Sequence, residues 1–172
     1  MEPFKIGDKV IYPNQGLGVI EDIKEGDYQG EKFKIYHLRI PSPNTLILIP
    51  FSKAEEIGIR KPISLDSIED IFEFMKNGTV DITMNWKGRY KEHVELMKTG
   101  AMDDMAFVLK GLFYLSLIKP LSFREKRMME KVKELIITEI SEVSALPSSV
   151  IEQKVMENLS YCYKDVTPGI DS

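Results

Sequence analysis

Over the first sixty residues, hydrophobic and polar residues alternate in short runs that are rich in β-branched and aromatic side chains. This period of two is typical of strands that bury one face. Turn-forming residues separate the runs at 13–16, 26–30 and 41–44. We therefore predict a small antiparallel barrel of the SH3 or Tudor type with five strands, over Lys9–Tyr12, Leu17–Ile23, Phe33–Ile40, Leu46–Pro50 and Ile57–Arg60.

From Ser64 onward the hydrophobic residues recur every three or four positions, which is the period of an amphipathic helix. Serine and asparagine residues stand where helices begin, and glycine or proline residues stand where they end. These signals predict five helices, from Ser64 or Asp66 to Lys76, from Asn85 to Lys98, from Met102 to the residue before Pro120, from Ser122 through Val143, and from Pro147 to about Tyr163.

The change of period predicts an α+β chain of two domains, a β-barrel followed by an all-α bundle of about five helices. We expect the barrel over residues 1–60, a linker over 61–66, the helical domain over 67–164 and a frayed tail over 165–172.

The composition is that of a globular chain, with 172 residues of which 43% are hydrophobic and 29% charged. The N-terminus lacks the pattern of a signal peptide, and no apolar run approaches the length of a membrane span. We therefore expect a cytoplasmic location and no membrane partner. With one cysteine, Cys162, and two separated histidines, His37 and His93, we expect no disulfide, no metal site and no cofactor.

The net charge of −4 hides an uneven distribution. Residues 84–133 carry 11 Lys and Arg against 6 Asp and Glu, a net charge of +5. The flanking segments 1–60, 61–83 and 134–172 carry −1, −3 and −5. A local positive segment suits a site that contacts a few phosphates and depends on a partner for the rest of its affinity.

Trp86, the single tryptophan, begins this positive segment and is followed closely by Lys87, Arg89 and Lys91. A flat ring beside cations can wedge against nucleic-acid bases while the cations hold phosphates. Trp86 also shares a helical spacing with Tyr90, Val94 and Met97, which is the pattern of a buried stripe. If Asn85 caps the helix, Trp86 lies at its tip, where both interpretations remain open.

Catalytic patterns are weak. Asp103-Asp104 stands at a predicted helix start, where acidic residues stabilise the helix dipole. His93 has no Ser, Cys or carboxylate spaced for a triad, and Gly16-Leu17-Gly18 lacks the third glycine and the helix of a dinucleotide site. We therefore do not expect an enzyme.

Several stretches resemble the CarD/CdnL family of bacterial RNA polymerase regulators. Residues 4–13, Gly16-Leu17-Gly18, the extended stretch ending at Pro50 and Gly58-Ile59-Arg60 are similar to the polymerase-interaction domain of this family, which the transcription-repair coupling factor also contains. The motifs similar to the family's helical DNA-binding domain are Asn85-Trp86, Arg89-Tyr90-Lys91, Leu121-Ser122 and Glu125-Lys126-Arg127-Met128. The resemblance covers about residues 3–145.

The resemblance implies that the barrel binds the RNA polymerase β subunit. We assign this contact to Tyr36, Leu46, Leu48 and Pro50. Family members often carry basic residues at positions that align with Gly26 and Leu48. Because those cations are missing here, the contact is expected to rest more on backbone strand pairing and on apolar packing by Leu46 and Leu48.

The resemblance also implies a tryptophan, here Trp86, that wedges into the minor groove of promoter DNA at the upstream edge of the transcription bubble and stabilises the open complex. Lys91 and Lys126 match basic residues that contact the DNA backbone in the family. From position and charge we add Asn85, Lys87, Arg89 and Arg127 to the DNA-binding set. Recognition of the junction between duplex and bubble is expected to be largely independent of sequence.

Two alternatives remain open at this point. The chain can be an adaptor that binds RNA polymerase or another protein without contacting DNA, with its basic helices serving as a solvated surface. An enzyme would need a pocket with converging titratable groups. We expect a monomer whose association with the nucleoid depends on RNA polymerase.

Overall fold

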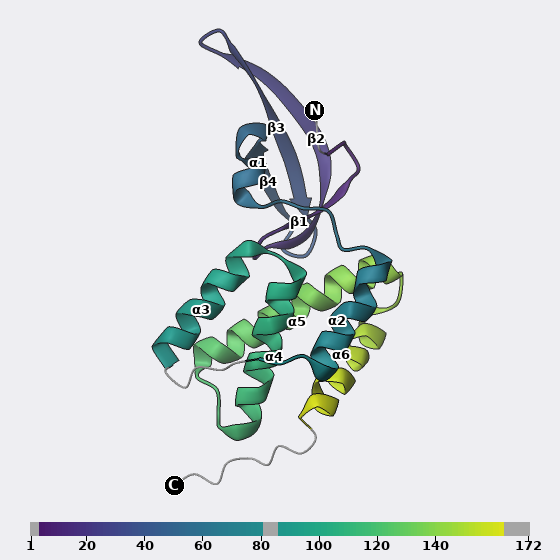
Figure 1. Ribbon diagram of the computed structural model, residues 1–172. Helices are drawn as coiled ribbons and strands as arrows, with labels where there is room; N and C mark the ends of the chain where they lie inside the picture. Colours follow the sequence, from purple (N-terminus) through teal and green to yellow (C-terminus); the bar gives the residue numbers. More distant parts are fainter. Residues whose placement is uncertain (1–3, 81–85, 164–172) are drawn as a thin grey trace. The chain divides into compact units, whose positions relative to one another are not determined.

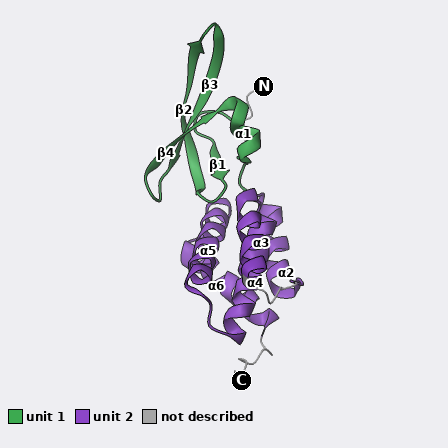
Figure 2. Cartoon of the chain, turned by 90° about the vertical axis from the view of Figure 1, so that its left-hand side faces the viewer, with its two compact units in different colours: residues 1–62 green, residues 63–172 purple. Residues whose placement is uncertain are grey.

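The computed structural model describes residues 4–80 and 86–163, and it divides into two compact units (Figure 2). Unit 1 spans Met1–Pro62 and unit 2 spans Ile63–Ser172. Unit 1 contains the strands and one short helix, and unit 2 is helical (Figure 1). The predicted α+β fold class, a small antiparallel β unit followed by a helical region, is confirmed.

Unit 1 is a four-stranded antiparallel sheet in the order β1-β2-β3-β4. Each strand pairs with the next one along the chain, so short turns suffice to connect them. The Gln29-Gly30 turn between β2 and β3 has positive φ at both residues, 54° and 83°, which matches the twist of a tight hairpin. The strands are β1 (Lys9–Tyr12), β2 (Gly16–Tyr28), β3 (Glu31–Ile40) and β4 (Thr45–Pro50).

The predicted fifth strand, Ile57–Arg60, is wrong. Residues Phe51–Ile57 form helix α1, and only Arg60 makes an isolated bridge to Ile11. The helix begins directly after Pro50 and ends at Gly58, whose φ of 89° is the left-handed C-cap that glycine favours. Its Phe51 ring stacks on Tyr36 with 4.0 Å between centroids, so the helix packs against the sheet.

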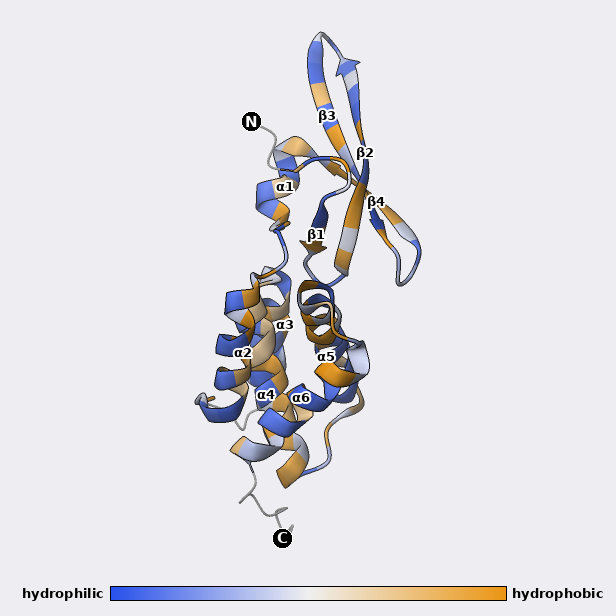
Figure 3. Ribbon diagram, turned by 90° about the vertical axis from the view of Figure 1, so that its right-hand side faces the viewer, coloured by the Kyte–Doolittle hydropathy of each residue, from blue (hydrophilic) through white to orange (hydrophobic). Residues whose placement is uncertain are grey.

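The hairpin of β2 and β3 is also longer than predicted. β2 continues through Tyr28, so residues 26–28 of the predicted turn lie in a strand. In Figure 3 the tip of the hairpin is largely hydrophilic, whereas β2 is largely hydrophobic near its start. In the second half of β3, buried residues alternate with more exposed ones. The inward set forms one core, made of Val10, Ile20, Tyr36, Leu38, Ile40 and Ile49, with Phe4 and Ala54 at its edge.

Unit 2 confirms all five predicted helices. Ser64 and Ser122 stand at the N-caps of α2 and α5, and Gly100, with φ of 69°, follows α3. The helices are α2 (Leu65–Asn77), α3 (Trp86–Thr99), α4 (Met102–Ile118), α5 (Phe123–Ser144) and α6 (Ser148–Cys162). In the described ranges, none of these helices combines the length and the apolar character that a membrane span needs.

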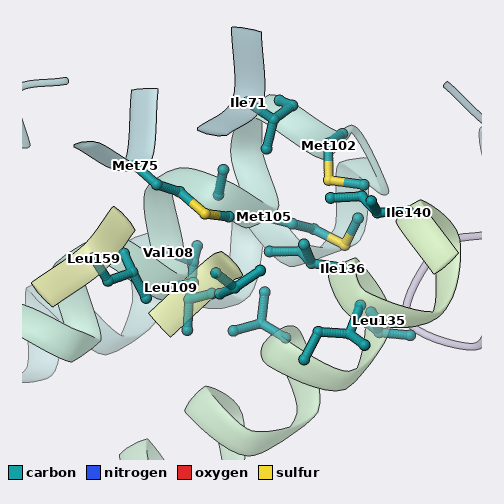
Figure 4. Close-up of a cluster of buried hydrophobic side chains, with 14 of the residues drawn as sticks. Ile71, Met75, Met102, Met105, Val108, Leu109, Leu135, Ile136, Ile140 and Leu159 are labelled. Atoms are coloured by element: carbon teal, nitrogen blue, oxygen red, sulfur yellow. The ribbon is translucent and has the colours of Figure 1, made fainter. Parts of the chain in front are cut away.

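The core of unit 2 surrounds α4, whose residues are buried on most sides. Ile71 and Met75 of α2 meet Met102 and Met105 of α4, and Ile136 and Ile140 of α5 lie against them (Figure 4). The flexible methionine side chains fill the space between branched residues, which is their usual role in a core.

Lys110 is a charged residue in this core, with no exposed surface. Its Nζ donates to the carbonyl oxygen of Phe74 at 2.7 Å and to that of Gly78. These carbonyls close the C-terminal end of α2, where the helix dipole favours a cation. Lys110 thus fixes the end of α2, and its charge is not part of the protein surface.

Candidate functional site

A buried ion pair joins the first turns of α3 and α5. Arg89 Nε donates to Glu125 Oε2 at 2.9 Å, and Arg89 Nη2 donates to Glu125 Oε1 at 3.2 Å. Both residues are 1% exposed. Two parallel bonds fix the angle between the guanidinium and carboxylate planes as well as their distance. The starts of the two helices therefore lie together at one end of unit 2 (Figure 1).

Two further interactions fix the start of α5 and join it to α3. The Ser122 hydroxyl accepts a hydrogen bond from the backbone N–H of Glu125 at 3.2 Å, which caps the helix. Arg124 lies over the ring of Tyr90 on α3, with 6.0 Å from the guanidinium carbon to the ring centroid. The α5 start is thus joined to α3 by a buried charge pair and a partly exposed cation–π contact.

Burial and the ion pair together shift the pKa values of Glu125 and of the neighbouring His93. Burial alone would raise the pKa of Glu125, but the hydrogen bonds and charge of Arg89 hold it below its usual value. Burial also lowers the pKa of His93, a 4% exposed residue one turn along α3, with Glu125 opposing and Arg89 reinforcing this shift. His93 Nδ1 has no hydrogen-bond partner among the described residues. The ionised pair and neutral His93 are therefore the stable combination.

Exposed cations lie in the first two turns of both helices. Lys87 and Lys91 lie on the exposed side of α3, and three further cations lie on the exposed side of the first turns of α5. We call this set the basic end; its members are Lys87, Lys91, Arg124, Lys126 and Arg127. Within the described part of the chain, Lys91, Lys126 and Arg127 form no ion pair with an acidic side chain. Their charge is available to an anionic ligand.

Four of the predicted DNA-binding residues are exposed and lie in the first two turns of α3 and α5; they are Lys87, Lys91, Lys126 and Arg127. Trp86 is the first residue of α3, three positions before Arg89, and its side chain lies outside the described part of the structure. Asn85 lies outside the described residues altogether.

The prediction that Arg89 contacts DNA does not agree with its position. Its side chain is buried, and Nε and Nη2 donate to Glu125, so a phosphate cannot reach these two nitrogens without breaking the pair. The spacing of Arg89 to Lys87 and Lys91 fits a cationic face, but it does not show which side of the helix faces α5.

Three residues at this end were missed from the sequence. Glu125 lies 36 positions from its partner Arg89, and no local pattern links the two. Arg124 completes the cationic surface, and Phe123 is 73% exposed beside it. The exposure of Phe123 could have been predicted from the sequence. Phe123 stands nine positions before the buried Val132, which places it on the opposite side of the helix.

Unit 1 presents a different surface along β4. This strand ends the sheet, and no strand among the described residues pairs with its outer edge. Its side chains alternate, with Ile49 buried and Leu46 and Leu48 39% and 54% exposed. Pro50 is exposed as well. The strand therefore offers free backbone groups and outward apolar side chains, which is what an added strand requires.

Tyr36 does not belong to this surface. It has no exposed area, stacks on Phe51 and meets Phe4 edge-on at 5.8 Å. Tyr36 lies between Ile35 and His37 in β3, whose side chains point outward, so its own side chain points into the core. The prediction that Tyr36 contacts the polymerase is therefore corrected: it is a core residue.

Gly26 is constrained by its cross-strand neighbour. The ring of Phe33 lies over it, and a Cβ at residue 26 would stand 2.2 Å from Phe33 Cζ. A larger residue at this position requires the ring to move. The Phe33 ring therefore occupies the space that a basic side chain at residue 26 would need.

Two family models match the chain, one for each unit. Residues 4–63 match the CarD-like/TRCF RID domain, and residues 70–156 match the CarD C-terminal domain. The curated protein "Putative transcription factor YdeB" of Bacillus subtilis (strain 168) is 31% identical over 149 residues, which cover 87% of this chain and 97% of that protein.

Two solved structures are similar to part of the chain. The solution structure of the N-terminal domain of Myxococcus xanthus CarD is 31% identical, with a TM-score of 0.29, and the match covers 34% of this chain and 77% of that one. The structure of CdnLNt from the same organism is 38% identical, with a TM-score of 0.31 and coverage of 37% and 90%.

Proposed function

Because the chain belongs to the CarD family of transcription factors, a family that is not enzymatic, we propose that it regulates transcription initiation by joining RNA polymerase to promoter DNA. Unit 1 carries the RNA polymerase interaction domain of this family. Unit 2 would supply the DNA contact.

Unit 1 would bind the polymerase β subunit by pairing the outer edge of β4 with a strand of that subunit. Backbone hydrogen bonds supply most of the affinity in such strand addition, and alternate side chains supply the specificity. Leu46, Leu48 and Pro50 point away from the core of unit 1 and are suited to this contact. The strand contains no charged residue, so this contact is expected to depend little on salt.

Unit 2 would bind the upstream edge of the transcription bubble. Trp86 would wedge into the minor groove, while Lys87, Lys91, Lys126 and Arg127, joined now by Arg124, would hold backbone phosphates. A wedged or stacked aromatic contributes about 1–3 kcal/mol, and about 1.4 kcal/mol changes an equilibrium tenfold. A regulator of open-complex lifetime needs a contribution of this size.

The observation that carries the proposal is the buried Arg89–Glu125 pair. It joins the start of the helix that bears Trp86 to the helix that bears Lys126 and Arg127. The pair therefore helps to fix where the cations of the two helices lie relative to one another. Arg89 is thus a positioning residue, which replaces the direct DNA contact predicted from its charge.

The test combines polymerase pull-down with the lifetime of promoter open complexes. Trp86→Ala and Lys91→Glu are each expected to shorten the lifetime, the first by about tenfold, while polymerase binding is retained. Lys98→Glu is the matched control, because Lys98 is an exposed lysine at the far end of α3 that pairs with Glu95 at 3.0 Å. Unchanged lifetimes with bound, folded variants would favour the protein-only adaptor.

A further inference from the structure

Phe123, the first residue of α5, has the highest exposure of any large hydrophobic side chain in the described residues, at 73%. The Arg127 guanidinium carbon lies 5.7 Å from the centroid of its ring, one helical turn further along. An exposed phenyl ring does not add to the free energy of unfolding, because its apolar surface stays in contact with water. The ring is therefore available to a ligand.

The ring is held at the same end of unit 2 as the start of α3. Glu125, two residues after Phe123, is buried against Arg89, and Arg124, the next residue, lies over Tyr90 of α3. Both neighbours are anchored to α3, so the first turn of α5 has little freedom to move. Phe123 thus projects from a start of α5 that is joined to α3 by two contacts, and Trp86 stands one turn before Arg89 in that helix.

The charge around Phe123 selects the kind of partner. Arg124, Lys126 and Arg127 are all exposed in the first two turns of the same helix, and Lys87 and Lys91 are exposed in the first two turns of α3. A second copy of this chain would bring two positive ends together, which like-charge repulsion opposes. A polyanion with flat, unpaired bases matches both the cations and the ring.

We propose that Phe123 is a second aromatic contact to promoter DNA, which stacks on an unpaired base at the junction between duplex and single strand. This inference rests on the proposed function, because it requires that the basic end binds DNA. Phe123 would grip a base that has already left the duplex, while Trp86 would act on the duplex side of the same junction.

The experiment compares the affinity of the full chain for a fork-junction DNA and for a duplex of the same sequence, by fluorescence anisotropy at one salt concentration. Phe123→Ala and Phe123→Leu are expected to lower the fork-to-duplex affinity ratio at least about fivefold. Phe123→Tyr is expected to keep it, because the ring is retained. Leu65→Ala is the matched control, since Leu65 is the first residue of α2 and is 63% exposed.

Three outcomes would overturn the proposal. The first is a wild-type ratio in Phe123→Ala, and the second is a wild-type ratio in Phe123→Leu, which would reduce the contact to apolar packing. The third is a loss of self-association in Phe123→Ala with unchanged DNA affinity, which would assign the ring to a second copy. Because the side chain is exposed, the variants are expected to unfold at the wild-type temperature, which a thermal scan checks.

Lys126→Glu separates this inference from the proposed function. If Lys126→Glu weakens DNA binding and Phe123→Ala keeps the wild-type ratio, the proposed function stands and Phe123 is only a surface residue. If neither variant alters binding to either DNA, the basic end is not a DNA site and both proposals are wrong.

Discussion

The edge of β4 and the basic end of unit 2 offer a partner opposite kinds of contact. β4 presents backbone groups and uncharged side chains along Thr45–Pro50. The basic end presents five cations at the starts of two helices, and the exposed Phe123 lies among those of α5. In unit 1 the proposed contact groups belong to the sheet itself, whereas in unit 2 they lie on two helices whose starts are joined by the buried Arg89–Glu125 pair.

This difference predicts how each surface responds to mutation. A strand edge retains its backbone hydrogen-bonding groups when one side chain is truncated, so the effect of truncation should be small. The basic end depends on a few charges and on a buried ion pair that links the starts of its two helices, so single substitutions there should have large effects. We therefore expect the largest effect at the ion pair and the smallest at the strand edge.

Arg89→Ala should give the largest effect. Removing one partner of a buried ion pair leaves the other charge buried and uncompensated, which costs about 3–5 kcal/mol of the free energy of unfolding. Urea unfolding of unit 2 measures this decrease. Lys91→Ala, an exposed change on the same helix, should stay within about 0.5 kcal/mol. A decrease below about 1 kcal/mol for Arg89→Ala would contradict the positioning role.

Neutralising two lysines of the basic end should come next. Removing one phosphate contact lowers the slope of log affinity against log salt by about 1, and weakens binding about tenfold at low salt. A double Lys91→Gln, Lys126→Gln variant should therefore bind promoter DNA about a hundredfold more weakly at low salt, with polymerase binding intact. A salt slope equal to that of the wild type would remove these lysines from the interface.

The buried His93 should make the stability of unit 2 depend on pH. Burial depresses its pKa in the folded state below that of the unfolded chain, so the unfolded state binds more protons as the pH falls below about 6.5. The stabilisation is present above that pH and is lost on acidification, before protonation of Glu125 breaks the ion pair.

His93→Leu isolates this contribution, because it removes the titrating group and fills a similar space. The melting temperature of the wild type should decrease between neutral and mildly acidic pH by more than that of the variant. Identical decreases in the two proteins would show that His93 does not titrate on unfolding.

Leu48→Ala should have the smallest effect. Leu48 is 54% exposed and points away from the core of unit 1, so its truncation should not affect folding. Most interface side chains contribute less than about 1 kcal/mol, and the paired backbone would remain. Polymerase affinity should decrease less than about fivefold in a pull-down titration. A decrease of about a hundredfold or more would make Leu48 the main anchor and would contradict contact through the backbone.

The elements of the fold were largely predictable from local signals. Alternation and turn residues located the four observed strands, and capping residues such as Ser122 located the helices of unit 2. The failure at Ile57–Arg60 has a local cause: the apolar Ile57 and Ile59 suit a strand, whereas Lys53–Glu56 suits the helix that forms before them. The helix forms and ends at Gly58, which adopts the left-handed conformation of a C-cap.

The candidate site was predictable only in part. Spacing and charge located the cations of the basic end, but could not tell that Arg89 and Lys110 are buried, because their partners are distant in the chain. Tyr36 was misassigned although its alternation with His37 already indicated the inward face. Whether a cation is buried depends on a partner that is distant in the chain, and the hydrophobic period of a helix contains no information on such partners.

The central claim, that the basic end lies on DNA at the upstream edge of the bubble, can be tested by tethered hydroxyl-radical cleavage in the open complex. An iron chelate is attached at Glu130→Cys, an exposed position one turn beyond Lys126, in a Cys162→Ser background; Glu157→Cys on α6 is the control. Cleavage of promoter DNA centred on the upstream junction, and stronger than from residue 157, is the predicted result. Equal cleavage from both positions, or cleavage centred elsewhere, would contradict it.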